Sequence, residues 1–72
     1  MKMATLKDLR LQARLSMAGL GRMANVDGKT VRRAEEGQPI QEVKAFAICE
    51  ALGKQLNQTL TITDVEGLKI YQ

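Results

Sequence analysis

The chain has 72 residues, of which 44% are apolar and 3% aromatic, and its formal net charge is +3. A chain of this length holds one domain, and its thin aliphatic core leaves little margin of stability, so we expect a second copy to contribute. One cysteine cannot form an internal disulfide, and without histidine a zinc site of ordinary ligand spacing is excluded.

The charge is unevenly divided along the chain. Residues 1–34 carry eight basic and two acidic side chains, whereas residues 35–72 carry three basic and six acidic ones. This asymmetry favours a polyanion as the ligand of the first half. No apolar run approaches the length of a membrane span, and the N-terminus lacks the apolar stretch of a secretory signal, so we expect no membrane association and a cytoplasmic location.

Three short helices are expected before residue 38, each begun by a side chain that can accept a hydrogen bond from the first free amides. These N-caps are Thr5, Ser16 and Asp27. The second helix should end at Asn25, which tolerates the left-handed conformation, and the third at Gly37. Apolar residues recur at helical spacing within the three segments, namely Leu6, Leu9, Ala13, Leu20, Met23, Ala24, Val31 and Ala34.

A fourth helix is predicted after the loop marked by Pro39, with Gly53 in the position that follows a helix. Its expected apolar face is broad and consists of Val43, Phe46, Ala47, Ile48, Ala51 and Leu52. Cys49 lies beside this face, and we interpret it as a small core residue.

From Asn57 the apolar period changes from that of a helix to two. Leu60 and Ile62 alternate with threonines, which predicts a strand over Thr59–Thr63, and a second short strand is expected over Leu68–Tyr71. Because two isolated strands are marginal in water, this C-terminal β ribbon, residues 57–72, should pair with a second copy. The predicted dimer interface is Leu60, Ile62, Leu68 and Ile70. A second candidate interface is the exposed part of the fourth helix.

Residues 16–37 contain the one specific motif, two short helices joined by a tight turn, with the small residue Gly21 where the helices come close. The residues of the motif are Ser16, Leu20, Gly21, Asn25, Val26, Asp27, Val31, Glu35 and Gly37. In these positions the chain resembles the Cro/lambda-repressor type (XRE family) of helix-turn-helix domain, and the similarity extends over residues 5–53. The resemblance implies a mainly α fold, with a four-helix lambda-repressor-like DNA-binding domain over residues 1–56 followed by the ribbon. It also implies a structural pair between Arg10 and Glu35.

The third helix is the candidate reader of the DNA major groove. Lys29, Arg32 and Arg33 lie at i, i+3 and i+4 and therefore share one face, opposite to Val31 and Ala34. We predict base contacts from these three residues and from the position of Gly28, since arginine to guanine is the commonest specific contact. Phosphate contacts that fix the register without reading sequence are predicted at Ser16, Met17, Arg22, Thr30, Lys7 and Arg14.

Together these features predict a small sequence-specific regulator of the kind found in phages, plasmids and bacterial operons, associated with the nucleoid. It would bind double-stranded DNA as a homodimer on a pseudo-palindromic operator, with repression as the default mechanism. The alternatives left open are an antitoxin that also binds a cognate toxin, and an interaction module that has lost DNA binding. No nucleophile is paired with a base, so we expect no enzyme activity, no cofactor and no metal.

Overall fold

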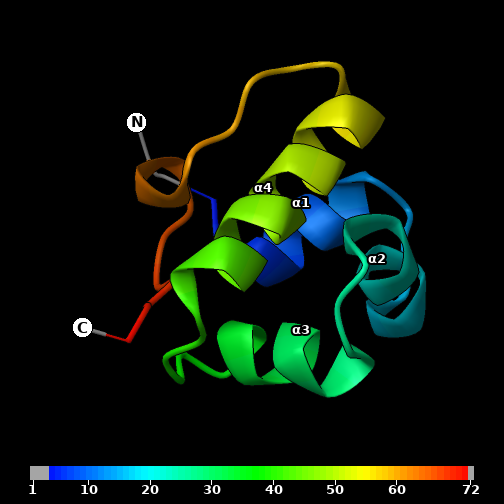
Figure 1. Cartoon of the computed structure of the whole chain (residues 1–72). Coiled ribbons are helices and arrows are strands. Elements are labelled where there is room, and N and C mark those ends of the chain that lie inside the picture. The colour runs from blue at the N-terminus through cyan, green and yellow to red at the C-terminus, as the bar shows by residue number, and fades with distance from the viewer. Residues whose placement is uncertain (1–3, 72) are drawn as a thin grey trace.

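The computed structural model describes residues 4–71 and is mainly helical. Its elements, in chain order, are α1 (Leu6–Gln12), α2 (Met17–Ala24), α3 (Gly28–Glu35), α4 (Glu42–Leu56) and the 3-10 helix η1 (Ile62–Asp64). In Figure 1, α4 crosses the middle of the molecule, α1 lies behind it, and α3 forms the edge opposite to the loop after α4. Helix α2 packs against both α3 and α4.

The predicted N-caps of the first three helices are confirmed. Thr5 accepts a hydrogen bond from the amide of Asp8, and the Asp8 carboxylate accepts one from the amide of Thr5, which completes a capping box. Ser16 caps α2 through the amide of Gly19 (2.9 Å), and Asp27 caps α3 through the amide of Lys29 (3.2 Å). Each helix therefore begins where its sequence provides a short polar acceptor.

All four α-helices end in the same way, with a residue of positive φ and a six-to-one backbone hydrogen bond across the last turn. Asn25 has φ 59° and Gly37 has φ 81°, as their places in the sequence predicted. Arg14 has φ 59° and Asn57 has φ 56°, so these two residues adopt the left-handed conformation with a side chain present. Arg14 consequently follows α1 and is not part of that helix.

Helix α4 differs from the prediction in where it ends and in which of its apolar residues are buried. It continues through Gly53 to Leu56, because Asn57 and not Gly53 is the left-handed residue that ends it. Gly53 is buried, and a Cβ atom there would lie 2.5 Å from the carbonyl oxygen of Gln58, so this glycine permits the chain to pass close to the helix. Val43 and Phe46, predicted to be in the core, are 79% and 62% exposed.

The predicted C-terminal β ribbon is wrong. Among the described residues no strand forms over 57–71; the segment instead wraps around its own helices and makes two isolated parallel bridges, Thr5 with Glu66 and Ile40 with Ile70. Thr61 and Asp64 form a capping box that begins η1, and this local preference prevails over the β-branched alternation. Figure 1 shows the segment returning past α4 to the linker before it.

The core lies between α4 and the other three α-helices. The side chains of Leu20, Val31, Ile48 and Leu52 have no exposed surface. Cys49 is buried as predicted. The four residues predicted to form a dimer interface pack as partly buried side chains against this same core: Leu60, Ile62, Leu68 and Ile70. These residues were assigned to a dimer interface because a β ribbon would have had an open edge. Since residues 57–71 form no ribbon, that reason no longer applies.

Candidate nucleic-acid interface

The geometry of the α2–α3 pair is set by the turn between the two helices. Asn25 takes the left-handed conformation, and the amide of Val26 donates to the carbonyl oxygen of Gly21 (2.8 Å). A Cβ atom at Gly21 would lie 2.8 Å from the carbonyl oxygen of Val26 and 3.3 Å from the amide nitrogen of Gly28. The close approach expected at Gly21 is thus confirmed, and it leaves no room for a side chain there.

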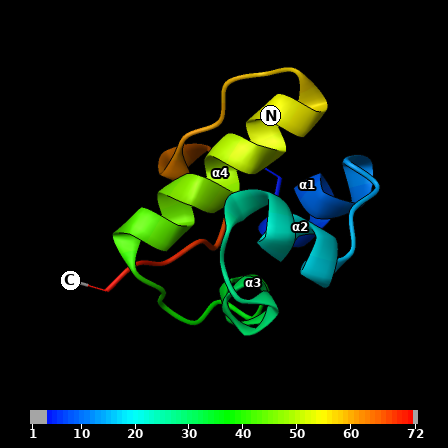
Figure 2. The same cartoon turned by 45° about the vertical axis from the view of Figure 1, so that its right-hand side comes forward.

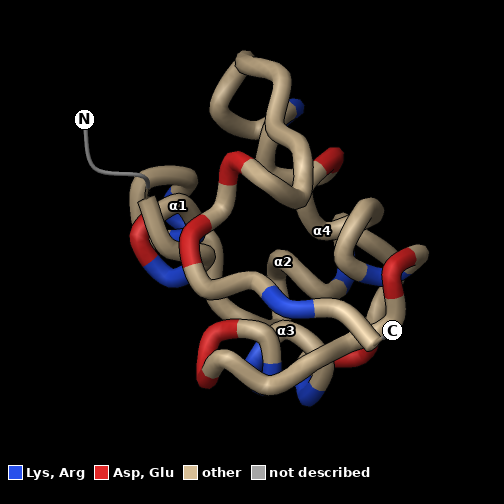
Figure 3. Tube along the Cα trace, turned by 90° about the vertical axis from the view of Figure 1, so that its left-hand side faces the viewer, with Lys and Arg blue, Asp and Glu red and all other residues tan. Residues whose placement is uncertain are grey.

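Helix α3 has two distinct faces. Val31 and Ala34 are 0% and 3% exposed and fix the helix to the core. Lys29, Arg32 and Arg33 are all exposed, on the opposite side. Figure 2 looks nearly along α3 and shows it at the periphery of the molecule, and Figure 3 shows basic positions at this edge. The three basic side chains can therefore meet a polyanion without any rearrangement of the fold.

The two arginines of this face have different neighbours. The Nε atom of Arg32 lies 3.4 Å from a carboxylate oxygen of Glu36 one turn later, and both side chains are largely exposed. An exposed pair of this kind contributes little stability and is easily exchanged for another anion. Arg33 instead donates to the phenol oxygen of Tyr71 (3.4 Å), which comes from the C-terminal segment.

The residues predicted to contact phosphates divide into two groups. Lys7, Arg14, Ser16 and Arg22 are exposed. The hydroxyl of Ser16 accepts the cap hydrogen bond and keeps its own proton to donate.

The second group, Met17 and Thr30, is half-buried, as is Gly28, which was predicted as a base contact. The Met17 side chain packs against the core, so any contact from this residue to a phosphate would come from its backbone amide, which lies in the unpaired first turn of α2. Gly28 faces the backbone of Ala18, whose Cα atom would lie 3.9 Å from an added Cβ atom.

The structural pair predicted between α1 and α3 is present. Arg10 donates from Nε and Nη2 to the two carboxylate oxygens of Glu35 (2.5 and 3.2 Å), and from Nη1 to the carbonyl oxygen of Leu15 (2.9 Å). The two side chains are 10% and 5% exposed. A bidentate arginine–carboxylate pair fixes the relative orientation of the two side chains as well as the distance between them. It therefore sets the orientation of α3 relative to α1.

One surface near α3 was not anticipated from the sequence. It brings Tyr71 and Lys44 beside Thr30 and Arg33 of α3. No local sequence pattern predicts this surface, because the contact of Tyr71 with α3 depends on how residues 66–71 return along the α3–α4 linker.

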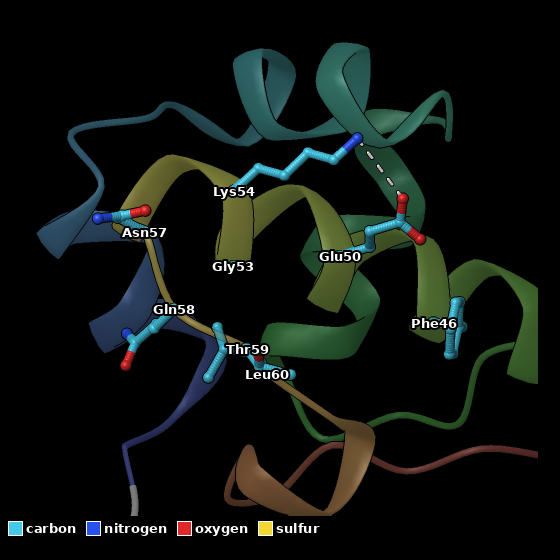
Figure 4. Close-up of a pocket in the computed structure, with 8 residues that line it drawn as sticks. All are labelled: Phe46, Glu50, Gly53, Lys54, Asn57, Gln58, Thr59 and Leu60. Carbon is cyan, nitrogen blue, oxygen red and sulfur yellow. Dashed lines mark ion pairs between the residues drawn. The ribbon is translucent and has the colours of Figure 1, made fainter.

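The exposed part of α4, which the sequence analysis gave as a second candidate interface, presents Val43 and Phe46 to solvent. Beside Phe46 runs a groove of about 570 Å³ between α4 and residues 57–60 (Figure 4). Glu50 and Lys54 lie along its wall, with an oxygen and a nitrogen 3.6 Å apart. An exposed phenylalanine next to a groove is the kind of surface through which proteins associate.

Comparison with known protein families, characterised proteins and solved structures finds no match to this chain. Within residues 4–71, no helix has the length and apolar character required to cross a bilayer.

Proposed function

We propose that this protein is a sequence-specific DNA-binding regulator of the helix-turn-helix class, with α3 as its recognition helix. The observation that carries the proposal is the pairing of two properties in one helix: a fully buried inner face and an outer face that presents Lys29, Arg32 and Arg33. A recognition helix requires both, since it must be held rigidly while its outer side chains enter the major groove.

The rest of the α2–α3 pair supports the same role. The turn at Asn25 and the contact at Gly21 fix the angle between the helices through backbone atoms alone. The N-terminus of α2, with the exposed hydroxyl of Ser16, gives donors suited to a backbone phosphate. Lys29 and Arg32 belong to the reading face, and Arg32 would exchange Glu36 for a base edge or a phosphate on binding.

The proposed active form is a homodimer. One copy of α3 reads only a few base pairs, and a two-fold pair of copies would read a pseudo-palindrome with half-sites one helical turn apart. With residues 57–71 packed on their own core, we place the second copy on the exposed side of α4, where Val43 and Phe46 are the two most exposed large apolar side chains of residues 4–71. At a two-fold axis close to Phe46 these apolar side chains would meet their own copies.

Repression is the mechanism that such a protein would use most simply. A regulator built from a reading helix and a dimer surface acts by occupying the promoter and excluding polymerase. It needs neither a cofactor nor a separate effector domain for that action.

The test is selection of bound duplexes from a random DNA pool by the purified protein at physiological salt, followed by sequencing. Enrichment of a pseudo-palindrome is the expected result, and its half-site spacing reports the dimer geometry. Retention without enrichment would replace the proposal with non-specific binding, and absence of retention would refute it.

Salt dependence separates this proposal from an interaction module or an antitoxin that acts only on a protein. Binding through phosphates releases counterions, so the logarithm of affinity should fall with log[salt] by about 0.9 per phosphate neutralised. A complex with a protein partner has no such dependence built into it.

A further inference from the structure

Beside α3 lies a shallow pocket of about 180 Å³ that no element forms alone. Helix α3 contributes Thr30 and Arg33, the start of α4 contributes Gln41 and Lys44, and the C-terminal segment contributes Tyr71. In Figures 1 and 2 the end of the described chain lies next to the α3–α4 linker, at the level where α4 begins.

The C-terminal segment is held there by backbone hydrogen bonds. The amide of Ile40 donates to the carbonyl oxygen of Lys69, and the amide of Tyr71 donates to the carbonyl oxygen of Ile40, both at 3.0 Å. Ile40 is itself buried at 3% exposure, so these bonds tie the segment to the core. Tyr71 is therefore placed beside α3 by the backbone, and its phenol oxygen accepts a hydrogen bond from Arg33.

The polar groups of the pocket suit an anion. Two of its side chains, Arg33 and Lys44, are cationic, none is acidic, and Thr30 and Tyr71 add hydroxyl groups that can donate. Within residues 4–71, neither cation is in an ion pair, whereas Arg10, Arg32 and Lys54 each have a carboxylate partner. Two cations concentrated without a counter-charge attract a singly charged oxyanion such as a phosphodiester.

The pocket also reassigns Arg33. Arg32 and Arg33 both belong to the last turn of α3, but of the two it is Arg33 that donates to Tyr71 and lines the pocket. We infer that Arg33, Lys44 and Tyr71 form a seat for one backbone phosphate of the bound DNA, so that Arg33 anchors the complex while Lys29 and Arg32 read sequence. This inference rests on the proposed DNA-binding function.

The test uses the full chain and the duplex recovered by selection, with affinity measured by fluorescence anisotropy over a series of salt concentrations. Arg33→Gln and Lys44→Gln should each weaken binding to all duplexes alike, by roughly 3- to 10-fold, and reduce the salt slope by about one. The enriched sequence should stay the same. Tyr71→Phe keeps both charges, so it should weaken binding by about 2- to 5-fold and leave the slope unchanged.

Lys69→Gln is the control, because Lys69 is an exposed lysine of the C-terminal segment whose side chain does not line the pocket. It should leave affinity and slope unchanged. The three substituted side chains of the pocket are not in the core, so circular dichroism should report an intact fold in every variant.

Neutral methylphosphonate linkages placed one at a time along the duplex sharpen the test. One position should weaken the wild-type complex and have no further effect on Lys44→Gln, which identifies the phosphate that occupies the pocket. If Arg33→Gln changes the enriched bases, or if neither charge variant changes the salt slope while wild type binds, the phosphate seat is refuted and DNA binding stands. If wild type binds no duplex, both proposals fall.

Discussion

The pair between Arg10 and Glu35 offers the sharpest test of how the reading helix is held. Glu35→Gln keeps the size of the side chain and removes its charge. The carboxylate is 5% exposed and accepts two hydrogen bonds from Arg10, which also donates to the carbonyl oxygen of Leu15. A glutamine can accept one of the two bonds through its amide oxygen, but its NH2 group would face the other arginine donor, and no negative charge would remain beside the guanidinium. The substitution therefore strands a positive charge in a site with little access to water.

Breaking a buried ion pair in this way costs about 3 kcal/mol. A chain of this length is stabilised by roughly 4–11 kcal/mol in all, at 0.05–0.15 kcal/mol per residue. In urea denaturation followed by circular dichroism, Glu35→Gln should lower the midpoint by about 3 M at a slope of ~1 kcal/mol/M. The loss would be a large part of the total stability.

The neighbouring residue supplies the control. Glu36→Gln removes a carboxylate paired with Arg32, but both of those side chains are largely exposed, so its cost should stay below about 0.5 kcal/mol. The double variant Arg10→Met with Glu35→Leu should recover most of the stability, since no charge is then stranded. Equal losses for Glu35→Gln and Glu36→Gln would refute the view that burial makes this pair matter.

Four further predictions follow from other parts of the fold. Gly21→Ala should lower the free energy of unfolding, measured by urea denaturation, by about 2 kcal/mol or more, because the new Cβ atom would lie 2.8 Å from a backbone oxygen. At Gly28 the nearest atom is 3.9 Å from an added Cβ atom, so Gly28→Ala should raise the free energy of unfolding by roughly 0.5 kcal/mol. Equal effects of the two substitutions would contradict the turn geometry. Arg14→Gly relieves a left-handed residue and should raise stability by about 0.5–1 kcal/mol while weakening DNA binding slightly; a loss of stability would show that Arg14 is not strained. Phe46→Ser should shift sedimentation equilibrium toward the monomer without unfolding the chain, and an unchanged association constant would exclude the α4 dimer. Burial, and secondarily the charge of Asp64, raises the pKa of the Cys49 thiol from 9.0 to about 11. The unfolded chain loses this proton at lower pH than the folded one, so the free energy of unfolding should fall between about pH 9 and pH 11. The Cys49→Ala variant should show a smaller fall, and an equal fall would mean that other groups cause it.

Local signals in the sequence were sufficient for the first three helices. Thr5, Ser16 and Asp27 each act within three residues of their own position, and Asn25 and Gly37 act on their own backbone. Such preferences do not depend on the rest of the chain, so the starts of the three helices and the ends of α2 and α3 could be predicted without knowledge of the fold. The end of α1 was not predicted, because Arg14 takes the left-handed conformation with a side chain that gives no such signal.

The errors lie where two local preferences compete or where packing decides. Thr61 and Asp64 could have been recognised as a capping box, but the alternating apolar residues around them also fit a strand. Val43 and Phe46 have helical spacing with the core residues of α4, yet the inner face of the helix is already filled by Ala45, Ile48 and neighbouring residues. Which apolar residues remain outside depends on how many neighbours the core can accept, and the order of residues alone does not specify that.

The candidate interface divides in the same way. The shared face of Lys29, Arg32 and Arg33 follows from helix periodicity, and the structure leaves all three exposed as expected. The neighbours of Arg33 could not be foreseen, because Tyr71 lies 38 residues further along the chain. Contacts of that range depend on the path of the whole C-terminal segment.

The return of that segment has a consequence for the order of events during synthesis. Glu66 is hydrogen-bonded to Ala4, and Tyr71 to Ile40, so the closing contacts join parts of the chain separated by 62 and 31 residues. Contacts between such distant residues form late, because closing the long loop between them costs chain entropy before the contacts add stability. A nascent chain that has left the ribosome only as far as α4 can already form its caps and turns, but it lacks Tyr71 and the pocket beside α3. On the proposed function, full affinity for DNA would arise only when residues 66–71 have been released and have closed against Ile40, so that a product truncated before them would compete poorly for the operator.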